Sequence, residues 1–182
     1  IASVLGLKKP TRYWYEKARG RDCSVCRILT SESSELVHYR DIMSYYNETT
    51  MSYNSSSYRF LLSLDPEQFL LMQIFDYVTL NTDRNRDNFG AEMCDNRFVG
   101  LYPVYDHDSC FKGKSTNGTY FPTGLTFAQT IEYLKSLQEY QLIQERIQTA
   151  VSYFSSYEFH DIFLKMKPVE VYESMLMRLK TL

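Results

Sequence analysis

The chain has 182 residues, enough for one domain with a buried core or for two small lobes that share an interface. Hydrophobic residues make up 44% and charged residues 23%, which is the composition of an ordinary globular protein. The net charge of −2 argues against direct nucleic-acid binding through a basic surface, because such surfaces neutralise phosphates with lysine and arginine.

The start of the chain, "IASVLGLKKP", lacks the charged n-region and the cleavage site of a signal peptide. No apolar run approaches the roughly 18 residues that a membrane span needs. We therefore expect a cytoplasmic protein that does not bind membranes. The first residue is not Met, so we also expect a fragment of a longer protein. Cys23 and Cys26 have C-x-x-C spacing, but no second pair completes a zinc site, and we expect reduced cysteines on a strand.

The first part of the chain gives weak patterns. Residues 1–22 are basic, and we expect irregular structure there, with "KKP" and "KARGR" as turns. Residues 24–39, "SVCRILTSESSELVHY", predict two short strands, or a strand and a connector, around a polar "SESSE" turn. Residues 48–57, "ETTMSYNSSS", predict a loop.

A helix is strongly indicated from residue 65 onward. Asp65 is a suitable N-cap, Pro66 suits the first helical position, and Gln68 completes a capping-box pattern. Apolar residues then recur at three- and four-residue steps as far as Val78, which predicts a helix with a wide apolar face. The helix ends where a highly polar stretch begins, "TLNTDRNRDNFG", residues 79–90.

The segments that follow predict a hairpin and more helices. "FGAEMCD" and "RFVGLYPVYD" flank the turn pair "DN" as two strands would. "GKSTNGTYFPTG" predicts a loop, residues 127–154 predict a helix, and a last helix begins at Pro168. The fold class predicted from these elements is α+β, with mostly α structure.

Three polar residues in this arrangement suit phosphate chemistry. Asp83 and Asn88 lie five apart in the polar loop, and Asp106 follows the hairpin. Oxygen ligands from Asn88 and Asp106 would suit Mg²⁺ together with phosphate oxygens, and Asp83 would orient a hydroxyl and accept its proton. Protein kinases divide the labour in this way. The alternative is that Asp83 and Asn88 cap a turn and that Asp106 only solvates a loop.

The same residues resemble a known family. "FDYVTLNTDRNRDNFG" resembles the catalytic loop of HipA-like serine/threonine kinases, approximately N-x-D-R-H-x-x-N-x-G after an apolar helix. "PVYDHDSCF" is similar to the metal-binding segment of that family, and "SVCRILTSESSELVHYRDI" is similar to its hinge-side strand. The resemblance covers roughly residues 23 to 111. It implies a kinase-like C-terminal lobe that uses ATP and Mg²⁺.

Carried over by position, the resemblance makes Asp83 the catalytic residue. It makes Asn81, Asn88 and Asp106 the cofactor-binding residues, with Asn88 and Asp106 holding the metal. One departure is Asn85, where the family usually has His, because an amide can form hydrogen bonds but cannot titrate.

Other features leave the site assignment and the extent of the kinase fold open. Asp108 is a second possible metal ligand, two residues after Asp106. Before Gly90 the chain has only two glycines and no glycine-rich loop, and its lysines there lie outside any V-A-I-K-like strand. We therefore predict a hinge-side segment or N-lobe remnant at residues 1–40 and a C-lobe at residues 41–182, with the N-lobe truncated or reduced. We expect this fragment alone to be inactive.

Three functions remain open from the sequence. The first is a bacterial HipA-like kinase that phosphorylates Ser or Thr of a protein substrate. The second is a degenerate kinase-like domain that acts as a binding or regulatory module, and the third is a Mg²⁺-dependent hydrolase. The family resemblance also suggests a toxin–antitoxin context with a DNA-binding antitoxin as partner, and a missing lobe would favour self-association.

Overall fold

The computed structural model describes all residues except 9–10, 12, 27–32 and 114. The helices are α1 (Ala2–Leu5), α2 (Tyr39–Tyr45), α3 (Ser56–Leu64), α4 (Pro66–Thr79), α5 (Phe127–Ser136), the 3-10 helix η1 (Gln138–Leu142), α6 (Gln144–Phe154), α7 (Tyr157–Leu164) and α8 (Val169–Lys180). The strands are β1 (Tyr13–Ala18), β2 (Arg21–Cys26), β3 (Ser34–His38), β4 (Gly90–Cys94), β5 (Arg97–Leu101), β6 (Thr119–Tyr120) and β7 (Leu125–Thr126). Among these helices, none is long and apolar enough to cross a membrane.

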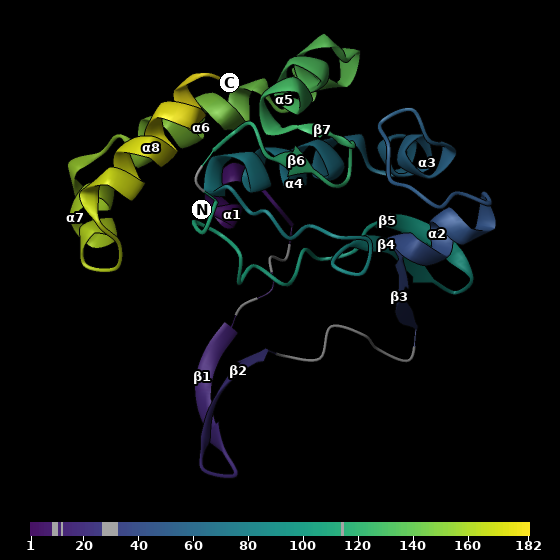
Figure 1. The fold of residues 1–182 in the computed structure, drawn as a ribbon, viewed down its shortest axis with the longest axis horizontal. Coiled ribbons are helices and arrows are strands. Elements are labelled where there is room, and N and C mark those ends of the chain that lie inside the picture. The colour runs from purple at the N-terminus through teal and green to yellow at the C-terminus, as the bar shows by residue number, and fades with distance from the viewer. Residues whose placement is uncertain (9–10, 12, 27–32, 114) are drawn as a thin grey trace.

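The prediction of irregular structure for residues 1–22 is wrong. They contain α1, β1 and the start of β2, and the two strands pair in antiparallel register. Arg19 and Gly20 form the turn with φ of 50° and 76°, so the predicted turn is real. Two positive φ angles give the twist that a two-residue hairpin needs. The strands were not predicted, because their charged residues obscure the alternation of apolar and polar positions. The hairpin projects away from the helices (Figure 1). Lys17 lies on β1, whose sequence "YWYEKA" is not V-A-I-K-like.

The predicted hairpin after the polar loop is confirmed. β4 and β5 pair around Asp95 and Asn96, whose φ angles are 48° and 58°. The two strands predicted in residues 24–39 are the end of β2 and β3, but they do not pair with each other. β2 pairs with β1, whereas β3 pairs with β4, which gives a three-stranded sheet in the order β3-β4-β5. The predicted polar turn between them lies partly outside the described residues.

Helix α4 forms the centre of the core. It lies between the C-terminal helices and the three-stranded sheet (Figure 1), and all its residues from Gln68 to Thr79 are buried, not just one face. The Asp65 Oδ1 atom accepts the Gln68 backbone N–H at 3.4 Å, as predicted. The capping box is not completed, because the Gln68 side chain instead binds the backbone of Gly6 and Lys8. This contact ties the N-terminal segment to α4.

The single helix predicted over residues 127–154 is wrong. The chain forms α5, η1 and α6 in turn, with extended backbone at Leu137, where ψ is 141°. No glycine or proline marks this break, and the apolar spacing continues across it. α7 was not predicted, α3 begins at the end of the predicted 48–57 loop, and the last helix starts after Pro168 as expected.

Candidate active site

The polar loop begins with a sharp reversal at the end of α4. Leu80 has a left-handed backbone, with φ 46°, and its N–H donates to the Tyr77 carbonyl. The N–H of Asn81 then donates to the Asp76 carbonyl at 2.8 Å. These bonds satisfy carbonyls that a helix end leaves free and direct the loop back along the helix.

A buried ion pair that the sequence analysis did not identify supports the loop. Arg84 donates from Nε to Asp76 Oδ2 and from Nη2 to Asp76 Oδ1, both at 2.9 Å, and neither side chain is exposed. The Nη1 atom of Arg84 donates to the carbonyls of Asn88 at 2.9 Å and Tyr105 at 2.7 Å. Burial acts to lower the pKa of Arg84, but the charge and hydrogen bonds of Asp76 outweigh it and raise the pKa. Arg84 thus joins α4, the loop and the segment after β5.

The Asp76 carboxylate has two further buried donors. Asn81 Nδ2 donates to Oδ1 at 2.9 Å, and the Tyr120 hydroxyl donates to Oδ2 at 2.7 Å. Asn81 is therefore a positioning residue in this structure, and its contact with a nucleotide stays a prediction. One clue to Asp76 was present in the sequence, because it is the lone charge in the apolar run "FLLMQIFDYV".

The loop itself holds Asp83 between two amides. Asn88 Nδ2 donates to the Asp83 carbonyl at 2.8 Å, and Asn85 Nδ2 donates to the Asp83 carboxylate at 3.2 Å. The Asn85 Oδ1 atom accepts the Asp87 N–H at 2.9 Å, which fixes the amide orientation. The Asp83 side chain is exposed, so it remains accessible to a substrate.

Asp106 lies within electrostatic reach of Asp83. Its backbone is left-handed, with φ 55°, and its N–H donates to the Tyr13 hydroxyl at 2.9 Å. Burial, a hydrogen bond with Asp108 and the charges of Asp108 and Asp83 raise the pKa of Asp106. The same hydrogen bond lowers the pKa of the exposed Asp108. Asp106 therefore lies among other carboxylates, and the charge of Arg84 acts on its pKa in the opposite direction.

His107 contributes packing and a neutral acceptor. Burial and the nearby Arg84 charge lower its pKa to about 4, so the ring is neutral near pH 7. Its Nδ1 lies 3.3 Å from Arg84 Nη2, and because guanidinium only donates, Nδ1 accepts.

The predicted metal ligands fit a hard divalent cation. The Nδ2 atom of Asn88 donates to the Asp83 carbonyl, and within the described residues the Oδ1 atom of Asn88 accepts no hydrogen bond. The carboxylate of Asp106 stands close to other negative charges, whose repulsion a cation would relieve. Oxygen ligands from one amide and one carboxylate leave room for water and phosphate oxygens, as Mg²⁺ prefers. In the described part of the chain, no three His, Cys, Asp or Glu side chains form a separate metal cluster.

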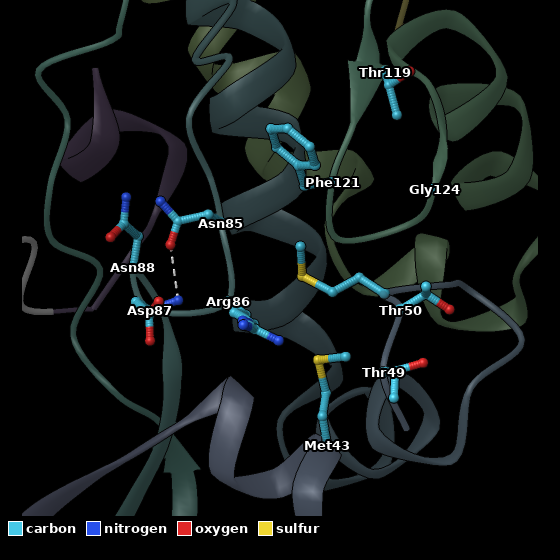
Figure 2. Close-up of a pocket in the computed structure, with 11 residues that line it drawn as sticks. Met43, Thr49, Thr50, Asn85, Arg86, Asp87, Asn88, Thr119, Phe121 and Gly124 are labelled. Atoms are coloured by element: carbon cyan, nitrogen blue, oxygen red, sulfur yellow. Dashed lines mark hydrogen bonds between the residues drawn. The ribbon is translucent and has the colours of Figure 1, made fainter. Parts of the chain in front are cut away.

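A pocket of about 580 Å³ opens beside the loop (Figure 2). Asn85, Asp87 and Asn88 line one side, and Met43 and Phe121 lie across the space. Asp83 and Asp106 are not among the lining residues. The pocket therefore includes Asn88 but not the carboxylates of Asp83 and Asp106, and it offers both apolar and amide groups to a ligand.

The comparison with solved structures supports this fold. No family model and no curated protein matches the chain. Among solved structures, the chain is similar to the Helicobacter pylori proinflammatory kinase CtkA, with a TM-score of 0.58 and 16% identity. The alignment covers 99% of this chain and 78% of that one. The chain has a kinase-like fold. The predicted α+β class and kinase-like lobe are therefore confirmed.

Proposed function

We propose that this chain carries the catalytic loop of a HipA-like protein kinase, which transfers the γ-phosphate of ATP to Ser or Thr of a protein. The proposal is supported by the way in which Asp83, Asn88 and Asp106 are held relative to one another. Asp83 and Asn88 belong to one loop that Arg84 clamps to α4 and to the Asp106 segment. Asp106 lies close enough to Asp83 for their charges to interact.

Each residue has a definite part in this proposal. Asp83 orients the substrate hydroxyl and accepts its proton, because its carboxylate is exposed and held by Asn85. Asn88 and Asp106 hold Mg²⁺, which when bound neutralises charge on the ATP phosphates. The adjoining pocket gives the protein substrate a place to contact Met43 and Phe121 while its hydroxyl approaches the loop.

The hydrogen bonds of Asn85 bear on whether an amide can replace the usual His at this position. The amide contacts both the Asp83 carboxylate and the Asp87 backbone. An amide N–H can therefore donate to Asp83 here, as a ring N–H of His could.

Metal binding gives a first test that does not require catalysis. Mn²⁺ replaces Mg²⁺ in most oxygen-ligand sites, and it broadens the NMR signals of nearby nuclei. We expect Mn²⁺ to broaden the amide signals around Asn88 and Asp106 in this chain, and Asn88→Ala or Asp106→Asn to weaken the effect. Equal broadening in both variants would exclude these ligands.

Phosphoryl transfer is the second test, made on the full-length protein. Asp83→Asn should abolish transfer from radiolabelled ATP and leave the melting temperature unchanged. Asp95→Asn is the matched control, since Asp95 is an exposed turn residue and Asn tolerates its φ of 48°. Mn²⁺ binding without any transfer in the unmodified protein would favour the binding-module alternative.

A further inference from the structure

A second pocket, of about 370 Å³, lies on a different part of the molecule. It is formed where α2 and α3 meet the sheet strands β3 and β5, which lie together at one end of the molecule (Figure 1). None of its lining residues belongs to the polar loop or to the Asp106 segment. The proposed kinase function therefore gives this pocket no role.

Four aromatic rings line the pocket as a connected series. Tyr45 and Tyr46 meet edge to face with ring centroids 5.1 Å apart, and Tyr46 lies 6.5 Å from Phe60. Phe60 meets Phe98 edge to face at 5.1 Å. Tyr45 is 80% exposed and Phe98 is 41% exposed. Exposed aromatic groups that gather around a cavity are typical of binding surfaces.

The pocket also carries negative charge. Asp41 lines it, and the charge of this carboxylate is only partly balanced by Arg40, whose Nε lies 3.5 Å away. The same guanidinium makes a shorter contact, 2.8 Å, with Asp87. One cation shared by two carboxylates leaves one negative charge unbalanced at the rim.

The strand register places another carboxylate on the same side of the sheet. Glu35 pairs with Met93, and Met93 pairs with Phe98. Residues directly opposite each other in neighbouring strands share a face, so Glu35 lies on the Phe98 face.

These groups fit the chemistry of one side chain in particular. A guanidinium stacks on aromatic faces and pairs with a carboxylate through two hydrogen bonds, and its methylene stem suits an apolar surface. The rings supply the faces, Asp41 the carboxylate, and Val37 and Ile42 the apolar surface. We propose that this pocket is a docking site for an arginine side chain of a protein partner.

An NMR titration of this chain tests the proposal without any catalytic readout. The probe is N-acetyl-arginine amide, and N-acetyl-citrulline amide is the control, because it keeps the shape but lacks the charge. We expect saturable shifts confined to residues 41–46 and to the neighbourhood of Phe60 and Phe98. Citrulline should bind at least about fivefold more weakly, as expected for loss of the cation–π and ionic contacts. Equal binding of the two probes, or shifts elsewhere only, would overturn the proposal.

Variants of the pocket provide the second part of the test. Asp41→Asn and Tyr45→Ala should each weaken arginine binding by about fivefold. Tyr45 is 80% exposed, so its loss leaves the core intact. Tyr157→Ala is the matched control, since Tyr157 is an equally exposed tyrosine, at 84%, on α7. Unchanged binding in both pocket variants, or an equal loss in the control, would show that arginine does not dock there.

Discussion

Arg84 and Asp76 form a two-point ion pair in which neither side chain is exposed to solvent. The pair joins the middle of the candidate catalytic loop to the helix that precedes it. Because Arg84 also binds the carbonyls of Asn88 and Tyr105, one side chain positions both ends of the predicted metal site. The buried pair therefore orders the loop from the core side, and the hydrogen bond of the Asn88 side chain to the Asp83 carbonyl adds to that order.

Replacing Arg84 should destabilise the protein strongly. Arg84→Met leaves the Asp76 carboxylate buried without its cation, and breaking such a buried pair costs about 3 to 5 kcal/mol. Urea denaturation followed by circular dichroism measures the change in the free energy of unfolding.

An exposed pair of the same type provides the control. Arg40 contacts Asp87 at 2.8 Å, but their side chains are 52% and 46% exposed. Arg40→Met should cost under about 1 kcal/mol, because solvent screens the pair. A similar loss in the two variants would contradict the supporting role of the buried pair.

The Tyr120 hydroxyl should contribute more than that of a comparable tyrosine. Tyr120 donates to the charged Asp76 carboxylate at 2.7 Å, whereas Tyr172 donates to the neutral Phe154 carbonyl at 2.8 Å, and both rings are buried. Hydrogen bonds to charged groups are the stronger class. We expect Tyr120→Phe to cost about 1.5 to 3 kcal/mol and Tyr172→Phe about 1 kcal/mol in denaturation experiments. The reverse order would show that Asp76 does not depend on Tyr120.

The sequence predicts the parts of this site that arise from local pattern. Helix α4 and the β4–β5 hairpin are predicted because apolar spacing, a cap and a turn pair lie close together in the chain. The break at Leu137 was not predicted, since no residue there forbids a helix. The end of the helix at Leu137 therefore depends on tertiary packing, which the local sequence pattern does not indicate.

The contacts that support the loop could not be predicted from the local sequence pattern either. The Asp76–Arg84 pair joins a helix to a loop eight residues later, and its other partner, Tyr120, lies 44 residues from Asp76. An Asp in an apolar run indicates only that some partner must exist. Asp83 precedes the β4–β5 hairpin and Asp106 follows it, and the charge of Asp83 helps to raise the pKa of Asp106.

Asn85 should affect the rate of phosphoryl transfer more than substrate binding. Asn85→Ala removes the donor that holds the Asp83 carboxylate at 3.2 Å. We expect kcat of the complete protein to fall about tenfold, which corresponds to roughly 1.4 kcal/mol, with KM for ATP little changed. Asn85→His should keep most of the activity, because a ring nitrogen restores a donor.

The control for this change is Asn54→Ala, which removes an exposed amide far from the loop in sequence. It should leave kcat and KM as they are. A rise in KM without a fall in kcat for Asn85→Ala would place Asn85 in substrate binding instead.

Gly90, the first residue of β4, should not tolerate even one added methyl group. A Cβ atom there would lie 2.1 Å from the Val37 carbonyl oxygen and 2.9 Å from the His38 Cα, and both are backbone atoms. β3 would have to move away from β4, and His38 would move with it. The Nδ1 atom of His38 lies 3.1 Å from the Asp87 carbonyl oxygen, so this contact with the loop would be disturbed. We expect Gly90→Ala to cost about 2 to 3 kcal/mol, as for other overpacked sites.

Gly118→Ala is the matched control for this close approach. Its Cβ atom would meet only the Ser115 carbonyl oxygen, at an ordinary 3.8 Å, and its φ is not positive. The change should alter the free energy of unfolding by less than about 0.5 kcal/mol. Denaturation of both variants, with amide NMR spectra of the Asp83–Asn88 loop, measures stability and loop order together. If Gly90→Ala proved as mild as Gly118→Ala, β3 would be free to shift, and its close approach to β4 would not be what positions His38 against the Asp87 carbonyl.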